Sequence, residues 1–228
     1  MEDFFSRSSA LLGSEAMKAL ESKRVIIFGV GGVGSWAAET LIRTGLVHIT
    51  LVDDDTVQPS NLNRQLPATR ATIGMPKVEA LRERLLQLNP DAQITARCER
   101  VNGAWLTANG LEGYDFVIDA IDSVADKTDL ILYATRVRGV KIFSSMGAAL
   151  RFDPTQVTTG ELMSIKGDAL ARAVRERMKR LGAKPSRKVR CVYSTEHAQA
   201  CETRGSLMQV TAVFGCTLAA LVVKNICD

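Results

Sequence analysis

A run of glycines and a later aspartate are the first residues in this chain with the spacing for chemistry. Gly29, Gly31, Gly32 and Gly34 follow an apolar run and precede a helical pattern. In that context a glycine-rich turn lets the backbone approach phosphate groups at the amino end of a helix. Asp53 follows Gly34 by 19 residues, where a carboxylate can hold ribose hydroxyls. These features predict a nucleotide site and, taken alone, favour a dinucleotide over a ligand-free tight turn.

Two cations move the prediction from a dinucleotide to ATP. Arg64 lies in the run Ser-Asn-Leu-Asn-Arg-Gln at 60–65, and Lys77 follows Gly-Met-Pro at 74–76. ATP brings extra negative charge, which arginine, lysine and a metal must neutralise as pyrophosphate leaves. The segment Asp-Ala-Ile-Asp-Ser at 119–123 ends an expected strand, where carboxylates can meet the ligand and hold Mg²⁺. Each cation alone would be an ordinary surface charge, but the set together predicts an ATP–Mg²⁺ site.

The elements that must position these residues alternate between strand and helix. Strands that alternate with helices imply parallel βαβ units. We therefore expect an α/β fold, with a Rossmann-like, doubly wound, mainly parallel sheet, flanking helices and a C-terminal helical or mixed extension. A single domain over 1–228 is expected, with a nucleotide-binding part at about 20–150 and a substrate-facing part at about 151–228. The expected strands are 25–28, 48–52, 94–98, 116–121 and 141–145, and the expected helices are 14–22, 36–44, 77–88, 130–138, 168–181 and 206–223.

Positive charge is concentrated in one segment of an otherwise ordinary globular composition. Of 228 residues 46% are hydrophobic, and the formal net charge is only +4. Residues 166–190 nevertheless carry ten Lys or Arg against two acidic residues. On the expected helix 168–181, about 100° of rotation per residue separates a basic side from an apolar stripe that runs from Leu170 to Leu181. A solvated helix face is one explanation, and a polyanionic partner is the other. The basic ridge comprises Arg172, Arg175, Lys179, Lys184, Arg187, Lys188 and Arg190.

Cysteine usage and the N-terminus indicate a reducing compartment. The five cysteines include no C-x-x-C pair, so we expect free thiols and no structural zinc site. Because the chain also opens without a signal-peptide pattern, we expect a cytoplasmic protein. The uncharged stretch 206–223 is long enough to span a membrane, yet it contains Gln209, Thr211 and Thr217. We interpret it as a buried core helix, with membrane association as the alternative.

These motifs together resemble the E1-like superfamily of adenylating enzymes, of the ThiF and MoeB type. The superfamily's G-x-G-G-x-G loop, N-L-x-R-Q motif, downstream lysine and D-x-x-D strand end all occur here. The resemblance implies that the four glycines line the phosphates and that Asp53 holds the ribose. It also implies a homodimer, because the segment Phe-Phe-Ser-Arg at 4–7 is similar to one whose arginine reaches the ATP of the neighbouring subunit. The resemblance assigns nucleotide binding to Asn61, Arg64 and Lys77, the metal to Asp122, and catalysis to Arg7, Arg64, Lys77 and Asp122.

Further segments narrow the resemblance to the tRNA threonylcarbamoyladenosine dehydratases. They are residues 119–124, 153–156, 175–177 and 191–196. The resemblance implies that ATP adenylates the threonyl carboxylate of N6-threonylcarbamoyladenosine in tRNA, after which the carbamoyl group of the modification closes a ring and AMP leaves. The partner of the basic ridge would then be tRNA and not DNA.

An E1-like activator of the C-terminus of a ubiquitin-like sulfur-carrier protein is the alternative function, with sulfur-transfer proteins as partners. Cys201 would form a thioester in that case and is otherwise a free thiol. Many such activators carry C-x-x-C pairs, which this sequence lacks. The segment 195–206 is also shorter than the crossover region that the resemblance leads us to expect.

Overall fold

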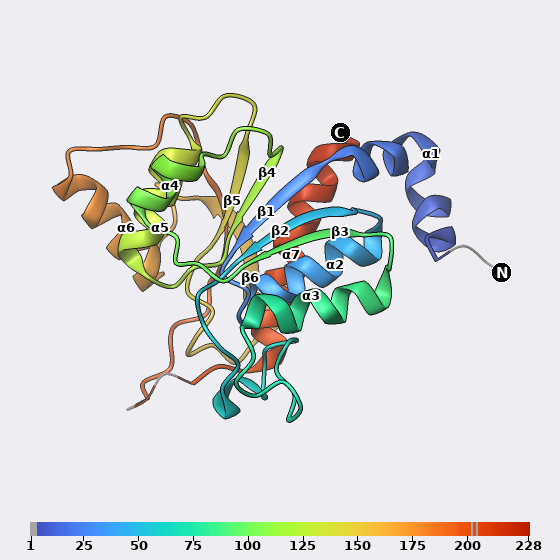
Figure 1. Ribbon diagram of the computed structural model, residues 1–228. Coiled ribbons are helices and arrows are strands. Elements are labelled where there is room, and N and C mark those ends of the chain that lie inside the picture. Colours follow the sequence, from blue (N-terminus) through green and yellow to red (C-terminus); the bar gives the residue numbers. More distant parts are fainter. Residues whose placement is uncertain (1–3, 202, 204) are drawn as a thin grey trace.

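A seven-stranded sheet with the strand order β3-β2-β1-β4-β5-β7-β6 forms the centre of the protein, and helices lie on both of its faces (Figure 1). The computed structural model describes residues 4–201, 203 and 205–228. Every neighbouring pair of strands is parallel except β6 and β7, which are antiparallel. The α/β, doubly wound prediction is confirmed. The strands are β1 Arg24–Phe28, β2 His48–Val52, β3 Gln93–Arg97, β4 Phe116–Asp119, β5 Lys141–Ser145, β6 Val157–Glu161 and β7 Arg190–Ser194.

Six of the seven α-helices in the described residues cover the two faces of the sheet, and α1 packs against α7 and the turn after α2. Consecutive side chains of a strand point to opposite faces, so a strand buried on both sides is a continuous apolar run. In β1, Val25 and Ile27 accordingly pack in a core with α2, α3 and α7, whereas Ile26 and Phe28 pack with α4, α5 and α6. The helices are α1 Ser6–Ser22, α2 Gly34–Thr44, α3 Lys77–Leu88, α4 Gly103–Asn109, α5 Val124–Ala134, α6 Ala169–Arg180 and α7 Met208–Cys227.

Several helices begin or end at other residues than expected, and three elements were not expected. Helix α5 begins at Val124, six residues before the expected start, because the hydroxyl of Ser123 accepts a hydrogen bond from the Asp126 amide and caps the helix. Helix α1 begins at Ser6 and continues across a non-helical Gly13. Leu181 is the C-cap of α6 and 52% exposed, so it does not belong to the buried stripe of that helix. Helix α4 and strands β6 and β7 were not expected at all.

Only one side of helix α7 is buried in the core of the protein. Val210, Phe214 and Leu218 are fully buried in the core shared with α2. A Cβ atom on Gly215 would collide with the Val33 carbonyl, which shows how closely the two helices approach. On the opposite side α7 is apolar and exposed, and by length and composition alone it could cross a membrane. The expectation of a fully buried helix was therefore too strong, although packing against α2 supports its role in the core.

Candidate nucleotide site

The glycine loop joins β1 to α2 and is shaped by two close backbone contacts. Gly29 has φ +81°, and a Cβ atom there would lie 2.8 Å from the Ala120 carbonyl oxygen. A Cβ atom on Gly34 would collide with the Gly29 carbonyl. Helix α2 has no side-chain cap at its amino end, where an anion can bind, although the Ser35 amide in its first turn already donates to the Gly31 carbonyl at 3.2 Å. The loop therefore has the form of a phosphate cradle.

The segment after η1 (Pro59–Asn61) lies directly over this loop. Cβ atoms on Gly31 and Gly32 would lie 3.4 Å from Gln65 Nε2 and 3.3 Å from Arg64 Cγ, respectively. Trp36 Nε1, on α2, donates a hydrogen bond to the Arg64 carbonyl at 3.1 Å. Helix α2, which follows the glycine loop, thus holds Arg64 beside the cradle.

Neighbouring residues fix the shape of this segment and the direction of its guanidinium. Arg64 Nη1 donates to the Ser60 carbonyl at 2.9 Å and to Asn63 Oδ1 at 2.8 Å. Asn61 is buried, and its Oδ1 accepts a hydrogen bond from the Gln58 amide at 3.0 Å. Asn61 therefore shapes the turn that carries Arg64.

Asp53 and Lys77 meet on the β2 side of the loop. Asp53 Oδ2 accepts the Val30 amide of the glycine loop at 2.7 Å, and its Oδ1 accepts the Asp55 amide at 2.9 Å. Burial raises the pKa of Asp53 against the opposing effect of these hydrogen bonds and of Lys77. Lys77 is buried, and its Nζ lies 2.7 Å from the exposed carboxylate of Asp55. The carboxylates of Asp53, Asp54 and Asp55 lie within 4.8 Å of one another, a grouping that the sequence analysis missed although three consecutive aspartates are its signal.

On the β4 side, the two aspartates of the D-x-x-D motif have different surroundings. Asp119 is fully buried: its Oδ2 accepts hydrogen bonds from Lys127 Nζ at 2.7 Å and from Ser144 Oγ at 2.5 Å. It is not a free ligand, which corrects the expectation for this motif. Asp122 is exposed, and its carboxylate has no hydrogen-bond or ion-pair partner among the described residues. One such carboxylate together with substrate phosphates is the donor set that Mg²⁺ commonly takes, so Asp122 fits the expected metal.

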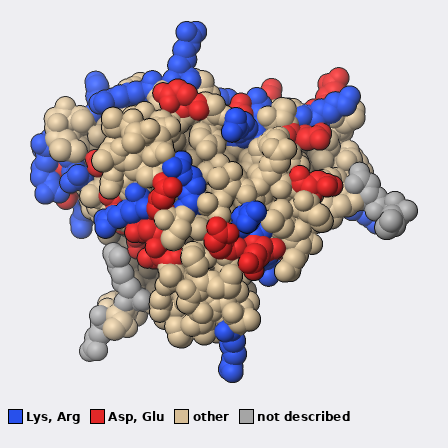
Figure 2. All heavy atoms as spheres, viewed as in Figure 1, with Lys and Arg blue, Asp and Glu red and all other residues tan. Residues whose placement is uncertain are grey.

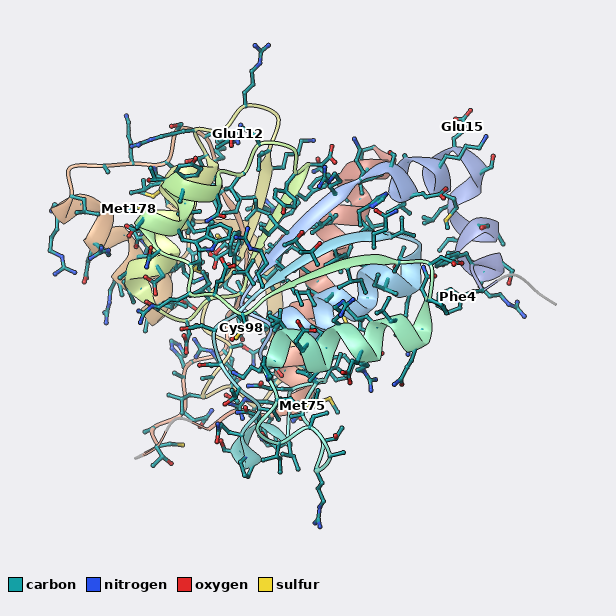
Figure 3. All side chains as sticks on the ribbon, in the orientation of Figure 1. Phe4, Glu15, Met75, Cys98, Glu112 and Met178 are labelled. Atoms are coloured by element: carbon teal, nitrogen blue, oxygen red, sulfur yellow. The ribbon has the colours of Figure 1, made fainter. Side chains whose placement is uncertain are left out.

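Arg7 lies at the other end of α2 from the glycine loop. Helix α1 contacts the turn after α2, where a Cβ atom on Gly45 would lie 2.6 Å from Met17 Cε. Arg7 is exposed on this helix. In Figure 3, Phe4 beside α1 is well separated from Met75, which lies in the loop before Lys77. The structure therefore keeps Arg7 apart from the nucleotide site of its own chain.

A match to the ThiF family spans residues 5–228. The chain belongs to the ThiF family. It is 39% identical over 197 residues to the tRNA threonylcarbamoyladenosine dehydratase of Escherichia coli (strain K12), covering 84% of this chain and 73% of that relative.

Two further comparisons show how far the similarity extends. The fold matches a crystal structure of E. coli tRNA N6-threonylcarbamoyladenosine dehydratase in complex with ATP, with a TM-score of 0.91, 36% identity and coverage of 97% and 93% of the two chains. The molybdopterin-synthase adenylyltransferase of E. coli (strain K12) is 38% identical over 141 residues, but these cover only 61% of this chain and 54% of the relative. The dehydratase similarity thus includes more of the chain.

The basic ridge of this ThiF-family protein is smaller than expected. Lys and Arg gather over α6, at the left edge of the molecule in Figure 2. Arg175 is half-buried, and its Nη1 donates to the Leu162 carbonyl at 2.9 Å. Arg187 Nη2 donates to carbonyls at and after the end of α5, at Ala134, Val137 and Val140. Backbone carbonyls thus hold both guanidinium groups, although Arg187 is exposed, and the exposed members without such bonds are Arg172, Lys179, Lys184, Lys188 and Arg190.

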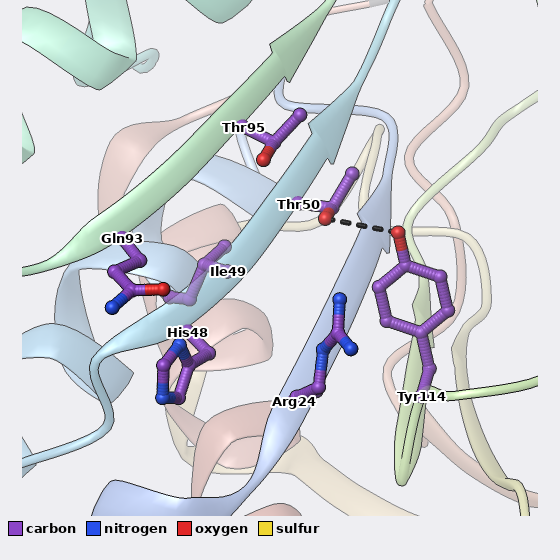
Figure 4. A pocket seen from close by; sticks show the side chains of 7 residues that line it. All are labelled: Arg24, His48, Ile49, Thr50, Gln93, Thr95 and Tyr114. Atoms are coloured by element: carbon purple, nitrogen blue, oxygen red, sulfur yellow. Dashed lines mark hydrogen bonds between the residues drawn. The ribbon is translucent and has the colours of Figure 1, made fainter.

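A cavity of about 260 Å³ lies on the sheet away from the glycine loop (Figure 4). Arg24, His48 and Gln93, which begin β1, β2 and β3, line it together with Thr50 and other residues. The Tyr114 hydroxyl and Thr50 Oγ1 are hydrogen-bonded at 3.0 Å at its edge. Ligands of such sheets bind beyond the carboxyl ends of the strands, so this cavity at the amino ends is not the nucleotide site.

Proposed function

We propose that this protein is an ATP-dependent tRNA threonylcarbamoyladenosine dehydratase. The observation that carries the proposal is the cradle of Gly31 and Gly32 with Arg64 above it and Asp53 beside it. Similarity over 97% of the chain to a dehydratase structure that contains ATP supports the same assignment. The protein would act in the cytoplasm, where tRNA is available.

The proposed chemistry needs orientation and charge neutralisation more than proton transfer. A threonyl carboxylate oxygen forms a bond to the α-phosphorus of ATP, and the bond from that phosphorus to pyrophosphate breaks. Amide groups of the glycine loop and the Arg64 guanidinium hold the phosphates in line. Lys77 exchanges Asp55 for a phosphate oxygen, and Asp122 would hold Mg²⁺, which supplies further positive charge. The carbamoyl group of the modification then attacks the activated carbonyl, and AMP leaves as the ring closes.

The test is to incubate the protein with ATP and threonylcarbamoylated tRNA. We expect AMP and pyrophosphate to form, and the mass of the modified nucleoside to fall by that of one water molecule. The control is the same tRNA without the modification. AMP formation that depends on a small protein with a glycine tail, and not on modified tRNA, would favour the sulfur-carrier alternative. The relatives support the dehydratase.

We also infer a homodimer in which Arg7 acts in trans, and α7 supplies the geometry. Its 20 residues span about 30 Å. Thr211, near its start, lies against the glycine loop, while its far end runs beside α1 and marks the C-terminus in Figure 1. A two-fold axis across the middle of α7 would bring α1 of one copy to the glycine loop of the other.

The outer side of α7 has the composition of an interface. Met208 is 45% exposed and Val213 is 36% exposed, and Cys216 and Ala220 are exposed on the same helix. An exposed apolar surface of this kind is buried in a closed symmetric dimer.

Mixing variants tests the dimer and the arginine together. Arg7→Ala and Asp122→Asn chains should each be inactive, and their co-refolded mixture should recover about a quarter of wild-type activity, because random pairing makes half of the dimers mixed and each mixed dimer has one intact site. Val213→Asp should give monomers in sedimentation analysis, whereas Arg138→Asp, in the exposed turn before β5, should not. No recovery on mixing would place Arg7 in cis, and an active Arg7→Ala chain would place it outside the reaction.

The remaining exposed ridge is the proposed tRNA contact. Its members bind a phosphate backbone without reading sequence, so binding should weaken linearly with the logarithm of salt concentration. Replacing Arg172, Lys179 and Lys184 with Gln should raise KM for tRNA and flatten the salt slope by about one unit per lost contact. Arg175→Gln, on the same helix but facing Leu162, is the matched control and should lower stability without changing the slope. An unchanged slope in the triple variant would mean that the ridge is a solvated face.

A further inference from the structure

Arg151 is a buried cation whose hydrogen-bonding capacity is largely unused. The residue is 5% exposed, and its Nε and Nη1 atoms have no hydrogen-bond partner in the described structure. Its nearest acidic neighbour is Asp168, at 4.0 Å from Nη2, which is beyond hydrogen-bond distance. Both Asp168 oxygens are already engaged, one by the Gly147 amide at 3.1 Å and one by the Ala171 amide at 2.8 Å. Leaving charged donors buried and unpaired is costly, which indicates that an absent group completes them.

The backbone beside Arg151 carries a second, independent signal. Leu150 has φ +61° and is the sole non-glycine residue with positive φ in the described part of the chain. A leucine in this region is strained, and such strain persists where the surrounding structure enforces it. Here the Leu150 amide donates to the Gly205 carbonyl at 2.9 Å, and the Leu150 carbonyl accepts the Gln199 amide at 2.9 Å. The strained residue therefore fixes the direction in which the chain presents Arg151.

Arg151 lies along the same sheet edge as the adenylation chemistry. It follows β5, whose last residue, Ser145, offers its carbonyl to Lys127 at 2.9 Å. Lys127 also pairs with Asp119, at the end of β4 and just before Asp122. Since β5 is two strands from β1, the start of this segment lies about 10 Å to the side of the glycine loop. A nucleic-acid substrate whose carboxylate reaches the ATP is large enough to extend from the glycine loop to this segment.

We propose that Arg151 binds an oxyanion of the RNA substrate, either the threonyl carboxylate before its adenylation or a phosphate close to the modified nucleoside. This proposal rests on the proposed function, because the oxyanion that Arg151 would bind belongs to the tRNA substrate named there. A guanidinium offers a planar pair of donors to such an oxyanion.

Two synthetic anticodon stem-loops, with and without the threonylcarbamoyl group on the adenosine, separate the two sources of the oxyanion. Both carry the same phosphates, and only the modified one carries the carboxylate. Dissociation constants are measured by fluorescence anisotropy without ATP for wild type, Arg151→Met and Arg151→Lys. We expect Arg151→Met to weaken binding by about tenfold or more, the loss typical of a charged hydrogen bond. A loss confined to the modified stem-loop identifies the carboxylate, and an equal loss on both identifies a phosphate.

Stability and turnover separate this role from a structural one. Because Met removes unpaired buried donors, Arg151→Met should melt at or above the wild-type temperature. Arg151→Lys keeps the charge and should bind more tightly than the Met variant. Wild-type affinity of Arg151→Met for both stem-loops, at any melting temperature, would overturn the inference. If wild type forms no AMP with modified tRNA, the proposed function fails, yet a binding loss in Arg151→Met would still establish the oxyanion site.

Discussion

Replacing Lys127 tests whether its buried ion pair with Asp119 stabilises the turn that carries Asp122. Its side chain is fully buried, and each of its three N–H donors has an acceptor: Asp119 Oδ2 at 2.7 Å, the Ser145 carbonyl at 2.9 Å and Ser144 Oγ at 3.3 Å. Lys127→Met keeps most of the side-chain length and removes the charge. Asp119 then remains buried without its cation, although the Ser144 hydroxyl and the Ile121 amide still donate to it.

The expected loss follows from breaking a buried ion pair on one side. Such changes typically cost about 3–5 kcal/mol, because the remaining charge is left uncompensated. For a chain of this size, each kcal/mol lowers the melting temperature by about 2–4 °C. We therefore expect Lys127→Met to melt roughly 6–20 °C below wild type. ATP should also bind more weakly, since Asp119 holds the Ile121 amide at the turn that carries Asp122.

Thermal unfolding with two companion variants checks this reasoning. Lys18→Met changes an exposed lysine on α1 and should stay within about 1 °C of wild type. Lys127→Met combined with Asp119→Leu removes both charges and should recover much of the loss, because no unpaired charge remains. If Lys127→Met alone melts like wild type, the buried pair is not supporting β4, and the account of the Asp122 turn is wrong.

The nucleotide site and the contact between α2 and α3 give three more predictions. Asp122→Asn should abolish AMP formation and leave the melting temperature unchanged, and near-normal turnover would refute its role. Gly34→Ala should lower ATP affinity by at least about tenfold in equilibrium binding, because its Cβ atom meets the Gly29 carbonyl, whereas Gly205→Ala has open space and should not. Burial alone would raise the pKa of Glu39, but hydrogen bonds from Arg84 and Arg43 hold that pKa below its usual value. The stability that this lowered pKa contributes is present above about pH 4.3 and is lost as pH falls through the folded pKa, so Arg84→Met should cost more stability at about pH 7 than at about pH 3.

The glycine loop was predictable because its requirements are local. Gly29 and Gly34 are needed for a positive φ and a close backbone contact within one strand–turn–helix unit, so their spacing is visible in the sequence. The same holds for most strands, whose apolar runs reflect burial on both faces. Strands β1 to β5 were consequently predicted, whereas β6, β7 and α4 were missed and several helix boundaries were wrong.

Residues whose partners come from elsewhere in the chain were not predictable in this way. Asp119 was expected at the ligand, but Lys127 and Ser144 reach it from α5 and β5 only after folding. A helical projection likewise places Arg175 on the basic side of α6, and only the tertiary structure brings the Leu162 carbonyl next to it. The roles assigned to Arg7, Lys77 and Asp122 remain predictions.

The contact of Gly215 with Val33 and Trp36 also has a consequence for the order of synthesis. The phosphate cradle is made among the first residues of the chain, but the helix that supports it from behind is made among the last. At 5–20 residues per second, the roughly 180 residues between them take about 10–40 s to translate. During that time the loop lacks its rear support, so the nucleotide cannot help the first half of the sheet to fold, and ATP can stabilise only a chain that has already acquired α7.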